Sequence, residues 1–106
     1  MYGSSTDWVG KLVEKISGMN LEEYFRQNIF GPLGMNSTWF NIPTQLQCLY
    51  VSSSRRHSIN GNIVLDKYEK RRRINNYKGG AGLSSSPEDY GKFLACMLNK
   101  GNFNGT

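Results

Sequence analysis

The sequence contains few residues that could bind a metal ion. It has two cysteines, Cys48 and Cys96, one histidine, His57, and no Cys-x-x-Cys pair. Because a structural zinc site needs four cysteine or histidine ligands at characteristic spacings, we expect no metal site and no cofactor. The two cysteines are far apart in the sequence. Two free thiols are the expected state, with a disulfide as the open alternative.

The sequence also lacks long hydrophobic runs. No stretch approaches the roughly 20 apolar residues that a membrane helix requires, so no membrane span is expected. A signal peptide, with its basic start and apolar centre, is missing as well, and turn-forming residues follow Met1 directly. At 106 residues the chain is one domain at most. Its abrupt start is what we expect of a piece cut from a longer chain.

Acidic residues are scarce in one segment. The chain carries 13 Lys and Arg against 8 Asp and Glu, a formal net charge of +5. Residues 55–78 hold eight basic and two acidic residues, or +6, which leaves −1 for all the others. The basic residues are Arg55, Arg56, Lys67, Lys70, Arg71, Arg72, Arg73 and Lys78. The run at 70–73 could bind nucleic acid or an acidic surface, but such runs are usually solvated loops, so nucleic acid is not an expected partner.

Three segments are predicted to be helices, at about residues 5–17, 21–30 and 87–100. Each carries apolar residues at helical spacing. We expect the apolar stripes of the first and third helices to lie in the core. These stripes are Trp8, Leu12 and Ile16, and Tyr90, Phe93 and Met97.

Polar residues at the helix ends support these bounds. Ser4, with Asp7 three residues later, resembles a capping box that would start the first helix. Asn20 and Ser86 are the predicted N-caps of the second and third helices. Gly18 is typical of the residue that ends a helix in a left-handed conformation.

Residues 45–78 are expected to form an irregular, basic insertion that contains a β-hairpin. The segments CLYVSSS and NGNIVL could pair around a polar connection with Arg55, Arg56 and the turn dipeptide Asn60-Gly61. Residues 37–42 could form another short strand. The glycines at 79, 80 and 82 mark a backbone that turns sharply or that another segment approaches closely. The predicted fold class is therefore mainly α with a small antiparallel β portion (α+β).

Three phrases, in order along the chain, carry a resemblance to a known family. They are YGSSTDWVGKLVEKISGMNLEEY (residues 2–24), IFGPLGM (29–35) and GGAGLSSSPEDY (79–90). Together they resemble the serine β-lactamase-like hydrolases, which include class C β-lactamases, D,D-peptidases and related esterases. The resemblance leaves residues 45–78 largely unmatched. It implies the helical part of a β-lactamase/transpeptidase-like fold.

The resemblance implies acyl transfer through an acyl-enzyme. The serine of a Ser-x-x-Lys motif attacks the carbonyl of a small-molecule ester, amide or β-lactam. A tyrosine of a Tyr-x-Asn-like motif acts as its partner base, because a serine hydroxyl is a poor nucleophile until a neighbour takes its proton. An unperturbed tyrosine has a pKa of about 10, so nearby positive charge has to lower it. In the family the motif lysines supply that charge, and a Lys-Thr-Gly-like strand lines the site.

By this resemblance, Tyr2 is the catalytic tyrosine, and Ser4 occupies the position at which the family usually has asparagine. Ser4 would contact substrate, cap the first helix, or do both. None of the serines is followed three residues later by lysine, and Lys-Thr-Gly is absent. The chain is therefore expected to be an internal fragment that begins at the second motif, ends before the third and is inactive alone. The family suggests a bacterial protein of the periplasm, cell envelope or medium.

The sequence supports two hypotheses of different classes. The first is a fragment of a serine hydrolase of the β-lactamase, D,D-peptidase or esterase type, whose uncovered apolar faces could cause self-association. The second is a helical binding module that uses the basic segment 55–78 to bind nucleic acid or an acidic surface.

Overall fold

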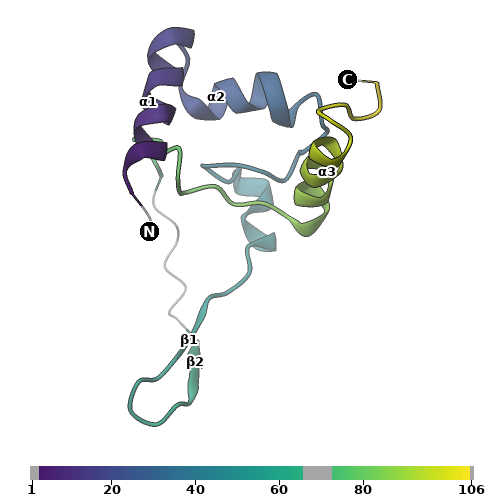
Figure 1. Ribbon diagram of the computed structural model, residues 1–106. Coiled ribbons are helices and arrows are strands. Elements are labelled where there is room, and N and C mark those ends of the chain that lie inside the picture. Colours follow the sequence, from purple (N-terminus) through teal and green to yellow (C-terminus); the bar gives the residue numbers. More distant parts are fainter. Residues whose placement is uncertain (1–2, 66–72, 106) are drawn as a thin grey trace.

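The computed structural model describes residues 3–65 and 73–105 (Figure 1). These residues form three α-helices, two short helical segments of other types and one two-stranded antiparallel sheet, so the predicted fold class is confirmed. The elements, in chain order, are α1 (Ser5–Ser17), α2 (Leu21–Phe25), a π-helical turn η1 (Arg26–Phe30), a 3-10 helix η2 (Thr44–Leu49), β1 (Ser54–Arg56), β2 (Ile63–Leu65) and α3 (Pro87–Leu98). Among the residues described, no helix has the length and apolar character needed to cross a membrane.

The start of α1 differs from the predicted capping box. Ser4 has helical backbone angles, and its side chain makes no capping hydrogen bond. The carboxylate of Asp7 instead accepts a hydrogen bond from the amide of Gly80, at 3.0 Å. The predicted capping box is wrong because the carboxylate of Asp7 binds a backbone amide far away in the sequence, which no local pattern reveals. The predicted end of α1 is present, since Gly18 has φ +72° and its amide donates to the carbonyl of Glu14.

The other two helices begin as their sequences predict. Asn20 caps α2 by accepting a hydrogen bond from the amide of Glu23, at 2.9 Å. Ser86 caps α3 by accepting from the amide of Asp89, at 3.2 Å, and Pro87 follows it. Helix α2 widens into η1, and the amide of Gly31 closes the last turn on the carbonyl of Arg26.

The small core lies between η1, the phrase GPLGM and α3. It consists of four buried side chains and four partly buried ones packed against them. These are Phe30, Leu33, Met35 and Cys96, with Phe25, Ile29, Phe93 and Phe103 around them. Phe40, fully buried, extends this core by stacking on Phe25 and meeting the ring of Tyr77 edge-on.

The apolar stripes of α1 and α3 do not lie in the core, contrary to the prediction. Trp8, Leu12 and Ile16 are 72%, 57% and 78% exposed, and Tyr90 and Met97 are also more than half exposed. Phe93 alone among the predicted stripe residues packs against the core. Helical spacing identifies the face that is apolar, but it does not say whether these 106 residues contain anything that covers it.

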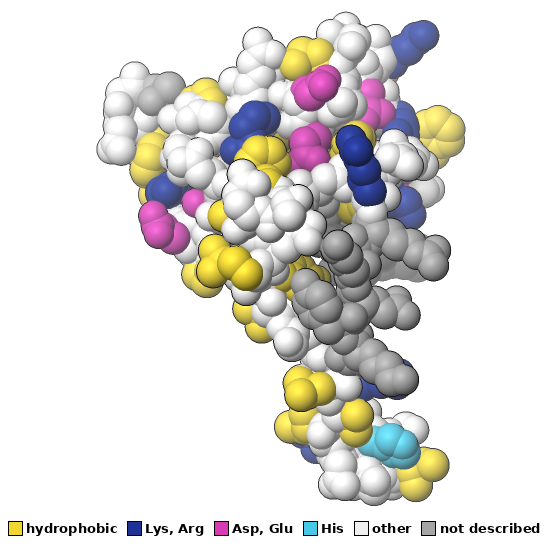
Figure 2. Space-filling view, turned by 180° about the vertical axis from the view of Figure 1, so that it is seen from behind, with side chains coloured by type: hydrophobic (Ala, Val, Ile, Leu, Met, Phe, Trp, Pro, Cys, Tyr) yellow, Lys and Arg dark blue, Asp and Glu magenta, His cyan; other side chains and the backbone are white. Residues whose placement is uncertain are grey.

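The predicted hairpin is present, but it begins later than expected. Strand β1 pairs antiparallel with β2 so that Arg55 faces Val64 and Arg56 faces Ile63. Both arginines were expected in the connection, and part of the predicted first strand lies instead in η2. Figures 1 and 2 show the hairpin projecting from the rest of the molecule, with His57 near its tip. The other expected strand, at 37–42, forms a single bridge between Trp39 and Ser84.

Candidate active site

The expected catalytic tyrosine, Tyr2, lies outside the described residues, so the candidate site is built from the start of α1 and the segments packed on it. Ser4 is exposed at the first turn of α1, and its hydroxyl is not used for helix capping. Asp7, in the same first turn, accepts a hydrogen bond from the amide of Gly80 in a distant loop. The first turn of α1 is thus contacted by a segment more than seventy residues away in the sequence.

That segment, the glycine loop (residues 79–82), packs closely on α1. A Cβ added to Gly79 would overlap the carbonyl oxygen of Thr6, and one added to Gly10 would lie 2.9 Å from the amide nitrogen of Gly79. Real Cβ atoms essentially never come this close, so both positions require glycine. The prediction of a close approach at the glycine loop is confirmed, and it joins the first and third phrases of the resemblance (Figure 1).

Two carboxylates hold the irregular segment 36–41 that comes after GPLGM. Glu22 accepts hydrogen bonds from the amides of Phe40 (2.7 Å) and Asn41 (2.9 Å). Asp89, only 3% exposed, accepts from the amide of Ser37 (2.7 Å) and from the hydroxyl of Thr38 (2.9 Å). None of these contacts was predicted from the sequence.

The guanidinium of Arg26 links the same segment to η1. It lies 3.7 Å from the ring centroid of Trp39 and donates hydrogen bonds to the carbonyls of Met35 and Thr38. Burial lowers its pKa, and the carboxylates of Glu22 and Asp89 oppose that shift. Arg26 therefore connects η1 to this segment through its hydrogen bonds and through stacking on Trp39, an arrangement that arginine commonly adopts on aromatic rings.

The described residues do not form a complete catalytic centre. They contain no group of three or more His, Cys, Asp or Glu side chains that could hold a metal ion. Cys48 is exposed and Cys96 is buried in the core, and both are free thiols. His57 is exposed on the hairpin, where its Nδ1 accepts from the amide of Ile59. The structure does bring the glycine loop and the first turn of α1 into close contact.

Comparison with known sequences decides the family. The sequence profile of the Beta-lactamase family matches residues 1–106, the whole of the chain. The chain belongs to the β-lactamase family. Two curated fungal relatives are a monacolin J acid methylbutanoyltransferase of Aspergillus terreus and a lovastatin esterase of Penicillium rubens. The transferase is 33% identical over 103 residues, which cover 94% of this chain and 25% of the relative. The esterase is 28% identical over 102 residues, which cover 92% of this chain and 26% of the relative.

Solved structures share the fold of this chain. A mutant simvastatin synthase of Aspergillus terreus has a TM-score of 0.87 at 33% identity, covering 93% of this chain and 25% of its own. A β-lactamase/D-alanine carboxypeptidase of Pseudomonas syringae has a TM-score of 0.66 at 24% identity, covering all of this chain and 27% of its own. That second likeness concerns the fold alone.

The chain spans about a quarter of the length of the relatives it matches. The expected bacterial origin is corrected by these relatives, because those with 33% identity come from fungi.

Proposed function

We propose that this chain is the tyrosine-bearing part of a β-lactamase-family enzyme that transfers an acyl group through an acyl-enzyme. The observation that carries the proposal is the family match over residues 1–106, in which the start of α1 and the glycine loop pack together. Since no serine here is followed three residues later by lysine, the nucleophile belongs to polypeptide other than these 106 residues.

In the proposed reaction, the hydroxyl of that serine attacks the carbonyl carbon of the substrate, and Tyr2 accepts its proton. The carbonyl then re-forms, the bond to the leaving oxygen or nitrogen breaks, and the proton passes to the leaving group. Water or an acceptor alcohol then attacks the carbonyl carbon of the acyl-enzyme and gives its proton to the base. The bond to the serine oxygen breaks, and the serine takes that proton back. General-base groups of this kind contribute about 10²–10⁴-fold to rate. Ser4 lies two residues after Tyr2 and is proposed to contact the substrate, because no capping bond uses its hydroxyl.

The proposed substrate is a small-molecule ester. The support comes from the relatives at 28–33% identity, which are named as a methylbutanoyltransferase and a lovastatin esterase. A β-lactam or a D-alanine peptide is the less supported choice, because the carboxypeptidase of Pseudomonas syringae is similar in fold only.

A chimaera tests this function. Residues 1–106 replace the matching quarter of the Aspergillus terreus methylbutanoyltransferase, which supplies the remainder of the domain. We expect the purified chimaera to transfer methylbutanoyl to monacolin J acid, and the isolated chain to show no turnover of any ester above buffer. A chimaera that unfolds cooperatively on heating but has no activity would contradict the proposal. Turnover by the isolated chain would contradict the placement of the nucleophile.

A further inference from the structure

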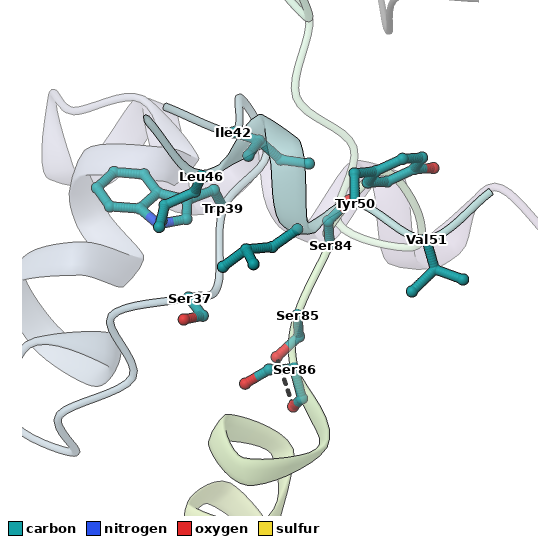
Figure 3. Close-up of a pocket in the computed structure, with 10 residues that line it drawn as sticks. Ser37, Trp39, Ile42, Leu46, Tyr50, Val51, Ser84, Ser85 and Ser86 are labelled. Carbon is teal, nitrogen blue, oxygen red and sulfur yellow. Dashed lines mark hydrogen bonds between the residues drawn. The ribbon is translucent and has the colours of Figure 1, made fainter. Parts of the chain in front are cut away.

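A groove of about 360 Å³ lies between the segment 39–51 and the serines that precede α3 (Figure 3). Its lining is largely apolar, and the hydroxyl-bearing side chains Ser37, Ser85 and Ser86 lie at the side toward α3. The apolar residues are Trp39, Ile42, Leu46, Leu49, Tyr50 and Val51. Small-molecule sites have this size and this combination of an apolar lining with a few polar groups.

A chain of hydrogen bonds fixes which way the Ser85 hydroxyl points its proton. The carboxylate of Asp89 can only accept, so the hydroxyl of Thr38, 2.9 Å away, donates its one proton to Asp89. The Ser85 oxygen lies 2.8 Å from the Thr38 oxygen, so the proton between them has to come from Ser85. The alternative acceptor, the carbonyl of Ser86, is 3.4 Å away and would leave the shorter contact without a proton.

Ser85 therefore meets the groove as an acceptor. Its proton is committed to Thr38, so the exposed Ser85 oxygen can only accept further hydrogen bonds, from water or from a ligand that donates one. Thr38 and Asp89 are both 3% exposed, so water does not readily displace the hydrogen bond between them. Ser86 accepts a hydrogen bond from the amide of Asp89 and keeps its own proton available to an acceptor.

From this arrangement we infer that the groove binds an apolar small molecule that ends in a hydroxyl group. The aliphatic part lies against Trp39 and Leu46, and the hydroxyl donates its proton to Ser85. The same oxygen can accept from Ser86, which an N–H donor without a lone pair could not do. The inference uses neither Tyr2 nor Ser4, so it does not rest on the proposed function.

Binding can be followed through Trp39. The chain has two tryptophans, and replacing the exposed Trp8 with phenylalanine leaves the groove residue as the only one. Titrating this Trp8→Phe chain with hexanol and with its isomer methyl pentyl ether compares a donor with a non-donor of the same composition. We expect hexanol to bind about two- to tenfold more tightly, the range for one net hydrogen bond.

Three variants test whether that preference arises in the groove. Ser85→Ala should reduce hexanol binding to the level of the ether, whereas Ser58→Ala, on the exposed hairpin, should change neither ligand. Leu46→Glu should abolish the binding of both, because it places a charge in the apolar wall.

The inference is overturned if hexanol and the ether bind equally, if neither binds, or if the preference survives Ser85→Ala. It is also overturned if the Trp39 signal changes with protein concentration alone, since a second copy of the chain would then cover the groove. Ser85→Ala removes one exposed hydroxyl, and a matched melting curve against Ser58→Ala checks that it is folded.

Discussion

Gly79 shows how one residue can fix the start of a helix. Its exposure suggests a position that tolerates change, yet a side chain there would overlap the carbonyl oxygen of Thr6. The sequence predicted a close approach from the three glycines of the loop. It could not name the partner, because Thr6 and Gly10 lie some seventy residues earlier.

Gly79→Ala should therefore lower the free energy of unfolding by about 1–3 kcal/mol, the usual cost of overpacking. Gly91→Ala is the matched control, because a Cβ there meets nothing within 4 Å and the residue lies inside α3. We expect the control to gain about 0.5–1 kcal/mol from better helix propensity. Urea unfolding followed by circular dichroism measures both, and equal effects would mean that the loop does not pack on α1 as described.

Substitutions of Glu22 and Glu23 test the carboxylate contacts of segment 36–41. Glu22→Ala leaves the amides of Phe40 and Asn41 without their acceptor, which should cost about 1–3 kcal/mol. Glu23→Ala removes an exposed carboxylate from the same helical turn and should cost less than about 0.5 kcal/mol. Denaturant midpoints decide between them. If the two losses were the same, the helix dipole, and not the long-range contact, would explain the role of Glu22.

At the level of elements, short-range sequence patterns predicted the helices and their ends. The helices were found because their apolar spacing, N-caps and terminal glycines all agree, as at Asn20, Ser86 and Gly18. The hairpin was placed only approximately, since strands of three residues are too short for alternation to fix their register. The capping box at Ser4 failed for a different reason, because Asp7 has a distant partner.

Ser4 and Ser86, the residues that precede α1 and α3, are expected to respond differently to substitution. Ser86→Ala should destabilise the chain by about 1 kcal/mol, because its hydroxyl accepts from the amide of Asp89. Ser4→Ala should leave the melting temperature nearly unchanged, because Ser4 makes no capping bond. Differential scanning fluorimetry of the two variants measures the contrast. A loss at Ser4 as large as that at Ser86 would restore the capping box that the structure rejects.

At the level of the whole molecule, the exposed apolar faces are the main departure from an ordinary domain. Trp8, Leu12 and Ile16 form one uncovered stripe on α1, while the core is confined to η1, the phrase GPLGM and α3. The relatives are about four times as long as the matched region, as expected of a piece of a larger fold. Periodicity predicted that α1 has an apolar stripe, but nothing within residues 3–65 and 73–105 covers that stripe.

The isolated chain should consequently self-associate at micromolar concentrations through this stripe. Replacing Leu12 and Ile16 by lysine together should shift the sedimentation profile towards the monomer. Ile59→Lys, on the hairpin, removes an equally exposed apolar side chain and should have little effect. Association that responds to Ile59→Lys but not to the α1 pair would place the contact on the hairpin.

The central claim is that Tyr2 takes the proton of a nucleophile supplied by the rest of the enzyme. The most direct measurement is the rate of acyl-enzyme formation in the chimaera with Tyr2→Phe, compared with Tyr90→Phe, which removes an exposed phenol on α3 away from the groove. We predict a fall of at least about 100-fold for Tyr2→Phe, within the range for a lost general base, and little change for Tyr90→Phe. Equal acylation rates in the two variants would contradict this role of Tyr2.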